Sequence, residues 1–220
     1  MEMWKDLFRT VRVGIGGPIG CGKTELIEKL VPRFKQLGFK VGVVSNDVYC
    51  TEDARRLAIT LSKEIDSNMI LGVETGGPPR TAVMDDPSMN IDAVKKLEKK
   101  NSGLDLVLIE SAGDNITLTF SPRLADFFIY MVDVSGGDKT IRKGGLGLTK
   151  ADLLIINKAD LAPYVETSIP ESDVKTANLD LMIEDAKKIR GDKPTVLASL
   201  KKEIGLDDIV KIIREHALLK

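Results

Sequence analysis

The chain has 220 residues, of which 43% are hydrophobic and 30% are charged, and this composition fits one α/β domain over residues 1–220 with a substantial core. The formal net charge of -1 provides no excess positive charge to attract a nucleic acid, and no apolar run is long enough to span a membrane. We therefore expect neither a nucleic acid nor a membrane as a partner. The two cysteines imply no disulfide framework, and the N-terminal residues lack the apolar core of a signal peptide, which together favour a cytoplasmic protein.

Residues 17–24 read Gly-Pro-Ile-Gly-Cys-Gly-Lys-Thr and match a phosphate-binding loop in full. An apolar stretch over 11–16 predicts a strand before the loop, and apolar residues at helical spacing over 24–31 predict a helix after it, which is the context that the motif requires. The residues predicted to surround the nucleotide phosphates are Gly17, Gly20, Cys21, Gly22, Lys23 and Thr24. Lys23 supplies a positive charge, and the hydroxyl of Thr24 can bind Mg²⁺.

A second strand is predicted over 39–45, and Asp47 follows it at the edge of the sheet where α/β proteins bind ligands. Its carboxylate can reach Mg²⁺ or orient an attacking water; the alternative is a helix N-cap for the segment that follows. After a helix predicted over 51–61, a short apolar run over 69–73 ends at Glu74. Glu74 is a candidate for the same Mg²⁺ shell or an ordinary surface glutamate.

A buried strand over 104–109 is followed by Glu110, Ser111, Ala112 and Gly113. An acidic residue that ends an apolar strand and is followed by glycine indicates a loop that senses the terminal phosphate, because the N–H of Gly113 can bind that phosphate. The next strand, over 127–132, leads into a segment at 133–147 with several glycines and basic residues. This segment is interpreted as a mobile surface loop or as a segment that contacts a partner or senses the nucleotide.

The last strong motif follows an apolar strand predicted over 153–156 and consists of Asn157, Lys158, Ala159 and Asp160. The carboxylate of Asp160 can accept hydrogen bonds from N1–H and the 2-amino group of guanine, which adenine cannot supply. Lys158 can lie along the base, and Asn157 can tie its loop to the phosphate loop. After a short strand at 196–198, backbone N–H groups near Ser199 and Leu200 could reach the guanine O6.

Helices are also predicted over 92–100, 183–190 and 206–218, so strands and helices alternate along the chain. His216 lies on the last of these helices and is expected to be a surface or packing residue. The expected fold is a three-layer P-loop NTPase with a mostly parallel central sheet flanked by helices.

Taken together, these motifs resemble the urease accessory protein G family of metallochaperone GTPases, which groups with the hydrogenase maturation GTPases among dimerising P-loop proteins. The resemblance runs from about Val11 to the C-terminal helix. It is carried by the segments Gly16–Thr24, Ser45–Tyr49, Thr51–Ala54, Gly72–Gly77, Met89–Asn90, Ile109–Asn115, Phe120–Pro122, Asp138–Gly145 and Asn157–Tyr164.

The resemblance implies a GTP-dependent homodimer that carries Ni²⁺ to a urease-type apo-metalloenzyme with the help of other accessory proteins. It places Thr24, Asp47 and Glu74 near Mg²⁺. The family carries Cys-Pro-His after Glu-Thr-Gly-Gly and binds nickel with the paired Cys and His of two subunits, but here Pro78, Pro79 and Arg80 occupy these positions. Proline and guanidinium are poor Ni²⁺ ligands, so nickel ligands are not identifiable, and Cys50 is the plausible substitute thiol.

The sequence therefore predicts a slow, partner-stimulated GTPase that binds GTP, GDP and Mg²⁺ and whose catalytic residues are Lys23, Asp47 and Glu110. Two alternatives stay open within the family: a GTP-dependent assembly or gating scaffold that has lost metal delivery, and a hydrogenase-maturation-type GTPase. A small-molecule kinase could use the same phosphate loop, but it would rarely need the guanine-selecting motif.

Overall fold

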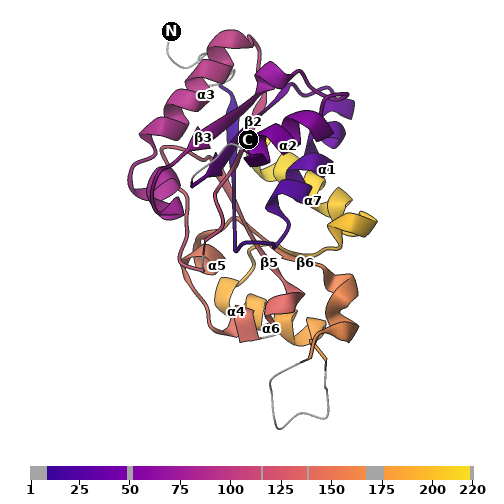
Figure 1. Cartoon of the computed structure of the whole chain (residues 1–220). Helices are drawn as coiled ribbons and strands as arrows, with labels where there is room; N and C mark the ends of the chain where they lie inside the picture. The colour runs from indigo at the N-terminus through magenta and orange to yellow at the C-terminus, as the bar shows by residue number, and fades with distance from the viewer. Residues whose placement is uncertain (1–8, 49–51, 115, 138, 167–175, 219–220) are drawn as a thin grey trace.

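The computed structural model describes residues 9–48, 52–114, 116–137, 139–166 and 176–218. A seven-stranded sheet forms its centre, with the strand order β3-β2-β4-β1-β5-β6-β7 (Figure 1). The strands are β1 (Val11–Gly16), β2 (Val41–Asp47), β3 (Ile70–Glu74), β4 (Leu106–Glu110), β5 (Phe127–Asp133), β6 (Leu153–Asn157) and β7 (Thr195–Leu197). Every pairing between these described strands is parallel, which confirms the predicted fold class.

Helices cover both faces of the sheet. The α-helices are α1 (Lys23–Gln36), α2 (Glu52–Thr60), α3 (Ser88–Lys100), α4 (Lys139–Arg142), α5 (Leu146–Lys150), α6 (Leu179–Arg190) and α7 (Leu206–Ile213). The side chains of α1, α2 and α7 belong to one hydrophobic core, and those of α3 to α6 belong to a second core on the opposite face. In the described part of the chain, no helix combines the length and hydrophobicity needed to cross a membrane.

Shorter helical turns complete several connections. They are η2 (Ser67–Met69), η3 (Thr81–Asp85), η4 (Val134–Gly136), η5 (Ala159–Tyr164), η6 (Leu200–Lys202) and η7 (Arg214–Leu218). The segment at 133–147, predicted as a mobile surface loop or as a segment that contacts a partner or senses the nucleotide, includes η4, α4 and the start of α5. Buried Ile141 within it and Leu148 just after it belong to the second core. The described part of this segment is therefore folded, because its few apolar side chains pack on the sheet.

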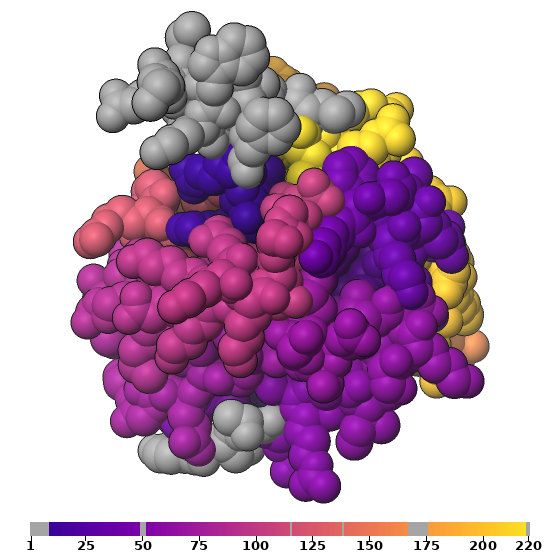
Figure 2. All heavy atoms as spheres, turned by 90° about the horizontal axis from the view of Figure 1, so that it is seen from above, coloured from indigo at the N-terminus to yellow at the C-terminus, as the bar shows by residue number. Residues whose placement is uncertain are grey.

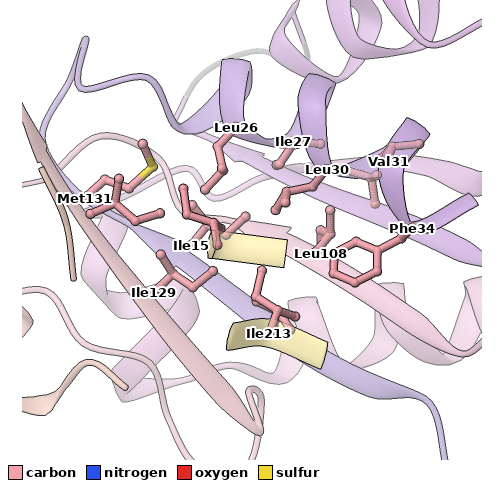
Figure 3. Packing of buried hydrophobic residues seen from close by; sticks show 14 of the residues in the cluster. Ile15, Leu26, Ile27, Leu30, Val31, Phe34, Leu108, Ile129, Met131 and Ile213 are labelled. Atoms are coloured by element: carbon pink, nitrogen blue, oxygen red, sulfur yellow. The ribbon is translucent and has the colours of Figure 1, made fainter. Parts of the chain in front are cut away.

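The helix after the phosphate loop explains how that loop is fixed. Apolar residues of α1 recur at helical spacing, so its buried side chains, such as Leu26, Leu30 and Phe34, form one stripe. This stripe packs on Ile15 of β1 and Leu108 of β4, as Figure 3 shows. Since β1 lies between β4 and β5 and its last residues are buried, the start of the phosphate loop has little freedom to move.

The opposite end of β1 is also held in place. In Figure 2, the beginning of β1 lies between the C-terminal residues, in yellow, and the residues that precede β5. The N–H of Arg12 donates to Oδ2 of Asp126 over 2.9 Å. All strands run the same way, so their carboxyl ends, and the loops with the predicted site residues, share one edge of the sheet.

Candidate functional site

A cavity of about 510 Å³ lies at the carboxyl ends of β1, β2 and β4. Its lining comprises Ile19, Gly20, Gly22, Lys23, Thr24, Glu25, Asn46, Asp47, Val48, Asp53, Arg56, Glu110, Ser111, Ala112 and Gly113. The structure thus brings together the predicted phosphate loop, Asp47 and the loop after Glu110. The motifs in the sequence give no role to Asp53 and Arg56, which lie in α2, the helix that follows the strand ending at Asp47.

The phosphate loop owes its shape to glycines in unusual backbone conformations. Gly22 has φ 104°, and a Cβ atom there would lie 2.4 Å from Nδ2 of Asn157. Gly17 has φ 150°, and a Cβ atom there would lie 2.3 Å from the carbonyl oxygen of Met131. These close approaches leave no room for a side chain, so glycine is required at both positions.

The amine of Lys23 lies within the loop that it belongs to. Its Nζ donates to the carbonyl oxygens of Gly17, over 3.0 Å, and Pro18, over 3.1 Å. The residue is only 7% exposed. Its positive charge is therefore held beside the cavity that it lines, which suits an anion with several oxygens.

Glu110 connects the phosphate loop with two neighbouring strands. The hydroxyl of Thr24 donates to Oε1 of Glu110 over 2.7 Å, and the hydroxyl of Ser45 donates to Oε2 over 3.1 Å. Burial raises the pKa of the Glu110 carboxyl to about 7, although the hydrogen bond from Thr24 opposes this shift. The Glu110 carboxyl can therefore exchange a proton near neutral pH while it contacts the hydroxyl predicted to bind Mg²⁺.

The two other predicted acidic ligands lie on neighbouring strands, but only one of them lines the cavity. Asp47 and Glu74 are opposite each other in the register of β2 and β3. Asp47 lines the cavity, and its Oδ1 accepts a hydrogen bond from the N–H of Val48 over 2.6 Å. Glu74 is exposed on an edge strand and is absent from the cavity lining. The geometry therefore favours Asp47 over Glu74 as a residue that faces a nucleotide.

A pair of buried amides beside the cavity has no counterpart among the predictions. Nδ2 of Asn46 donates to Oδ1 of Asn90 over 2.9 Å and to the carbonyl oxygen of Glu110 over 2.8 Å. In return, Nδ2 of Asn90 donates to Oδ1 of Asn46 and to the carbonyl oxygen of Ala82, each over 2.8 Å. This pair fixes the ends of β2 and β4 against α3 and η3. The only sequence signal was the presence of two asparagines in motifs of the family.

Asn157 ties the predicted base-binding motif to the phosphate loop. Its Nδ2 donates to the carbonyl oxygen of Cys21 over 2.9 Å, and its Oδ1 accepts the N–H of Leu200 over 3.1 Å. The side chain is almost fully buried. One amide therefore holds together three loops from distant parts of the chain, including the tie that the sequence predicted.

The charged residues of the base-binding motif already have partners. Nζ of Lys158 lies 2.6 Å from Oδ2 of Asp133, and Nζ of Lys202 lies 3.2 Å from Oδ2 of Asp160. The N–H groups of Ser199 and Leu200, expected to face a guanine O6, instead donate to Ile204 and Asn157. These internal bonds position the loop, so neither N–H group points freely at a base.

Pro78, Pro79 and Arg80 occupy the positions at which the resemblance to the family implies a Cys-Pro-His nickel motif. Arg80 and Asp85 form an ion pair of 3.6 Å, and both side chains are exposed. No group of three or more His, Cys, Asp or Glu residues in the described ranges could hold a metal ion. Burial raises the pKa of the Cys21 thiol to about 11, which disfavours the thiolate that a metal would need. Cys50, the proposed substitute, lies outside the described residues, and His216 is exposed on η7.

Comparisons with known proteins show to which family the chain belongs. The family model described as "CobW/HypB/UreG, nucleotide-binding domain" matches residues 11–189. The chain is 49% identical over 210 residues to urease accessory protein UreG of Edwardsiella ictaluri, covering 96% of each chain. It is 46% identical over 207 residues to UreG of Haloquadratum walsbyi, covering 94% of this chain and 96% of that protein.

Two solved structures are similar to this fold. The hydrogenase maturation factor HypB from Archaeoglobus fulgidus is 28% identical, with a TM-score of 0.73, and the match covers 97% of this chain and 93% of that one. HypB from Helicobacter pylori, solved in complex with nickel, has a TM-score of 0.76 at 24% identity, with 97% and 89% covered. The second likeness supports the fold alone. From the family model and the curated relatives together, the chain belongs to the CobW/HypB/UreG family and, within it, to the urease accessory protein UreG group.

Proposed function

We propose that residues 1–220 act as one domain that binds GTP with Mg²⁺, hydrolyses GTP slowly, and serves as an accessory protein in urease maturation. The observation that carries the proposal is the double contact of Asn157 with Cys21 and Leu200, which unites a phosphate loop with a guanine-type motif. Relatives at 46–49% identity that are named urease accessory proteins support the biological setting.

Three side chains and one backbone N–H group would bind the phosphates and Mg²⁺. The ammonium of Lys23 would neutralise the negative charge of the terminal phosphates, and the N–H of Gly113 would bind the γ-phosphate. The hydroxyl of Thr24 and the carboxylate of Asp47 line one cavity and are oxygen donors of the kind that Mg²⁺ prefers, so the donor set fits this ion. When bound, Mg²⁺ would neutralise charge that develops on the phosphate oxygens.

Glu110 has a different part in this proposal. It holds the hydroxyl of Thr24 and, with a pKa near 7, it can accept or return a proton next to the phosphates. The hydroxyl of Thr24 would have to give up its hydrogen bond to Glu110 before it could bind Mg²⁺. This exchange of partners would let the loop at 110–114 respond to the nucleotide state.

Recognition of the base would depend on Asp160. Its carboxylate would exchange the exposed ammonium of Lys202 for two donors on guanine. Adenine would leave the carboxylate without those donors, and a site built on such bonds discriminates strongly against the analogue. Asn157 would keep this loop at a fixed distance from the phosphate loop.

We further propose a GTP-dependent homodimer that works with other accessory proteins on a urease-type apo-metalloenzyme. A nucleotide panel tests the proposed activity: binding of GTP, GDP, ATP and ADP in the presence of Mg²⁺, followed by single-turnover and steady-state hydrolysis. The expected result is tight binding of guanine nucleotides with slow hydrolysis. Equal affinity for adenine nucleotides, or fast turnover without a partner, would contradict the proposal.

One observation favours a second candidate, a GTP-dependent assembly or gating scaffold that no longer delivers metal. Pro78 and Arg80 stand where the family has Cys and His, and the guanidinium of Arg80 is paired with Asp85. A cation at this place opposes the binding of Ni²⁺ by charge repulsion. A hydrogenase-maturation-type GTPase fits less well, because the curated relatives at 46–49% identity are named for urease.

A further inference from the structure

A carboxylate that belongs to none of the predicted motifs lies beside the base-binding loop. Asp133 is the last residue of β5, and its register partner on β6 is Asn157. Since parallel strands end at the same edge, this pairing places Asp133 next to the first residue of the guanine-type motif. Its Oδ2 lies 2.6 Å from Nζ of Lys158, and only 11% of the Asp133 side chain is exposed.

Lys158 occupies a backbone conformation that is unusual for its residue type. Its φ of 58° and ψ of 32° lie in the left-handed region, which side chains with a Cβ adopt at a cost. The conformation is held by the N–H of Ala159, which donates to the carbonyl oxygen of Ala198 over 2.9 Å. With the backbone fixed, the long side chain would still have many rotamers, and the ion pair with Asp133 selects one of them.

The other oxygen of Asp133 holds the segment that follows β5. Oδ1 accepts hydrogen bonds from the N–H and the hydroxyl of Ser135 and so caps η4. One carboxylate therefore joins the start of the 133–147 segment to the base-binding loop. The two functions use different oxygen atoms, so substitutions can separate them.

We propose that Asp133 is a positioning residue for guanine nucleotides, which fixes the Lys158 side chain in the orientation that lies along the base. This inference rests on the proposed function, because it assumes a guanine nucleotide at this site. Asp133 acts through Lys158 and does not itself touch the nucleotide. The ion pair already restricts the Lys158 side chain before the nucleotide binds. Less side-chain entropy is then lost on binding, and this is how Asp133 raises the affinity.

A double-mutant cycle tests the proposal with GDP as the probe and a fluorescent GDP analogue as the reporter. The variants are Asp133→Asn, Lys158→Ala and the double substitution, and Ser135→Ala is the matched control that removes only the hydroxyl contact of the cap. Asp133→Asn should weaken GDP binding by up to roughly tenfold, the scale of the entropy lost when one long side chain is immobilised on binding. It should have little further effect in the Lys158→Ala background, and Ser135→Ala should bind GDP like the wild type.

Three outcomes would overturn the inference: unchanged GDP affinity in Asp133→Asn, an equal loss in the Lys158→Ala background, or the same loss in Ser135→Ala. Thermal unfolding of each variant without nucleotide separates a folding defect from a binding defect. If Asp133→Asn proves unstable, Asp133→Glu offers a second variant, which should restore part of the affinity because it keeps the charge. A wild-type chain that fails to bind GDP would refute the proposed function itself, an outcome that the cycle distinguishes from failure of this inference.

Discussion

The amide of Asn157 uses its donor end on the phosphate loop and its acceptor end on the loop after β7. Because the side chain is buried, loss of the amide would leave the carbonyl oxygen of Cys21 and the N–H of Leu200 without partners in a region that water reaches poorly. Each of the three loops follows a different β-strand, and a second bond, from the N–H of Ala159 to the carbonyl oxygen of Ala198, joins two of them.

We predict that Asn157→Ala lowers the free energy of unfolding by about 2–4 kcal/mol, since two buried polar groups lose their partner. GDP affinity should fall as well, because the phosphate loop and the base loop separate. Asn101→Ala is the matched control: Asn101 is also a buried asparagine, bonded to Leu97, but it lies away from the cavity. Urea unfolding and GDP titration of both variants check this, and equal GDP affinities for the two variants would contradict it.

Glu110 provides a pH-dependent prediction. Its pKa rises from 4.5 to about 7 in the folded chain, chiefly because the carboxyl is buried. The folded state therefore keeps this proton over a pH range in which the unfolded chain has lost it. The sign follows from linkage: the free energy of unfolding falls as the pH rises from 4.5 to 7, by up to about 3 kcal/mol from this group.

Glu110→Gln removes the titration and keeps the shape of the side chain. We predict that the nucleotide-free variant gains stability relative to the wild type as the pH rises from 5 to 8. Denaturant unfolding at both pH values measures this difference. A constant difference between variant and wild type across that range would show that Glu110 does not titrate there.

At the scale of elements, the turn from β1 into α1 depends on a glycine packed against the base-binding loop. Gly22 has φ 104° and caps α1, and a Cβ atom would collide with Nδ2 of Asn157. Gly38, near the other end of α1, has φ 88° and open space around it. Both positions have a backbone conformation that favours glycine. Only at Gly22 would a side chain also collide with another residue of the site.

We predict that Gly22→Ala weakens nucleotide binding by at least tenfold, because the Asn157 amide must move and the loop N–H groups lose their alignment. Gly38→Ala should cost only about 1 kcal/mol of stability from its left-handed backbone and leave binding unchanged. Titration with GDP and thermal unfolding of both variants test the contrast. Tight GDP binding by Gly22→Ala would show that the loop tolerates a side chain here.

The sequence was sufficient to predict the strands and the order of the motifs, because apolar runs and the phosphate loop are local patterns. It was less informative wherever long-range contacts decide the structure. The short helix α4 is held by a 2.9 Å ion pair between Arg142 and Asp185 of α6, which no local pattern reveals. Likewise, β3 lies at the edge of the sheet, and Glu74 at its end does not line the cavity, although it also ends a predicted strand as Asp47 does.

Across the whole molecule, the nucleotide cavity and the 78–80 position are joined through the backbone. The N–H of Thr75 donates to the carbonyl oxygen of Asp47 over 2.9 Å, and the N–H of Gly76 donates to that of Val48 over 3.0 Å. A movement of the β2 end that followed nucleotide binding would therefore reach the loop before Pro78. These two bonds connect the end of β2 with the loop before Pro78, where Pro78 and Arg80 stand in place of the Cys and His that the resemblance to the family implies.

The replacement of the nickel ligands leads to a prediction about Ni²⁺ binding and dimer formation. With Mg²⁺ and a non-hydrolysable GTP analogue, the wild-type chain should form a dimer but hold no tightly bound Ni²⁺, because proline and guanidinium do not coordinate it. The double substitution P78C/R80H restores a Cys-Pro-His triplet and should gain Ni²⁺ in the dimer alone, while Arg80→Gln removes the cation without adding ligands and should gain none. Native mass and metal content, measured during titration with Ni²⁺ and Zn²⁺, show whether each variant forms a dimer and whether that dimer holds a metal ion. A wild-type dimer that shares a tight Ni²⁺ between its subunits would mean that other residues replace the missing ligands and that metal delivery survives.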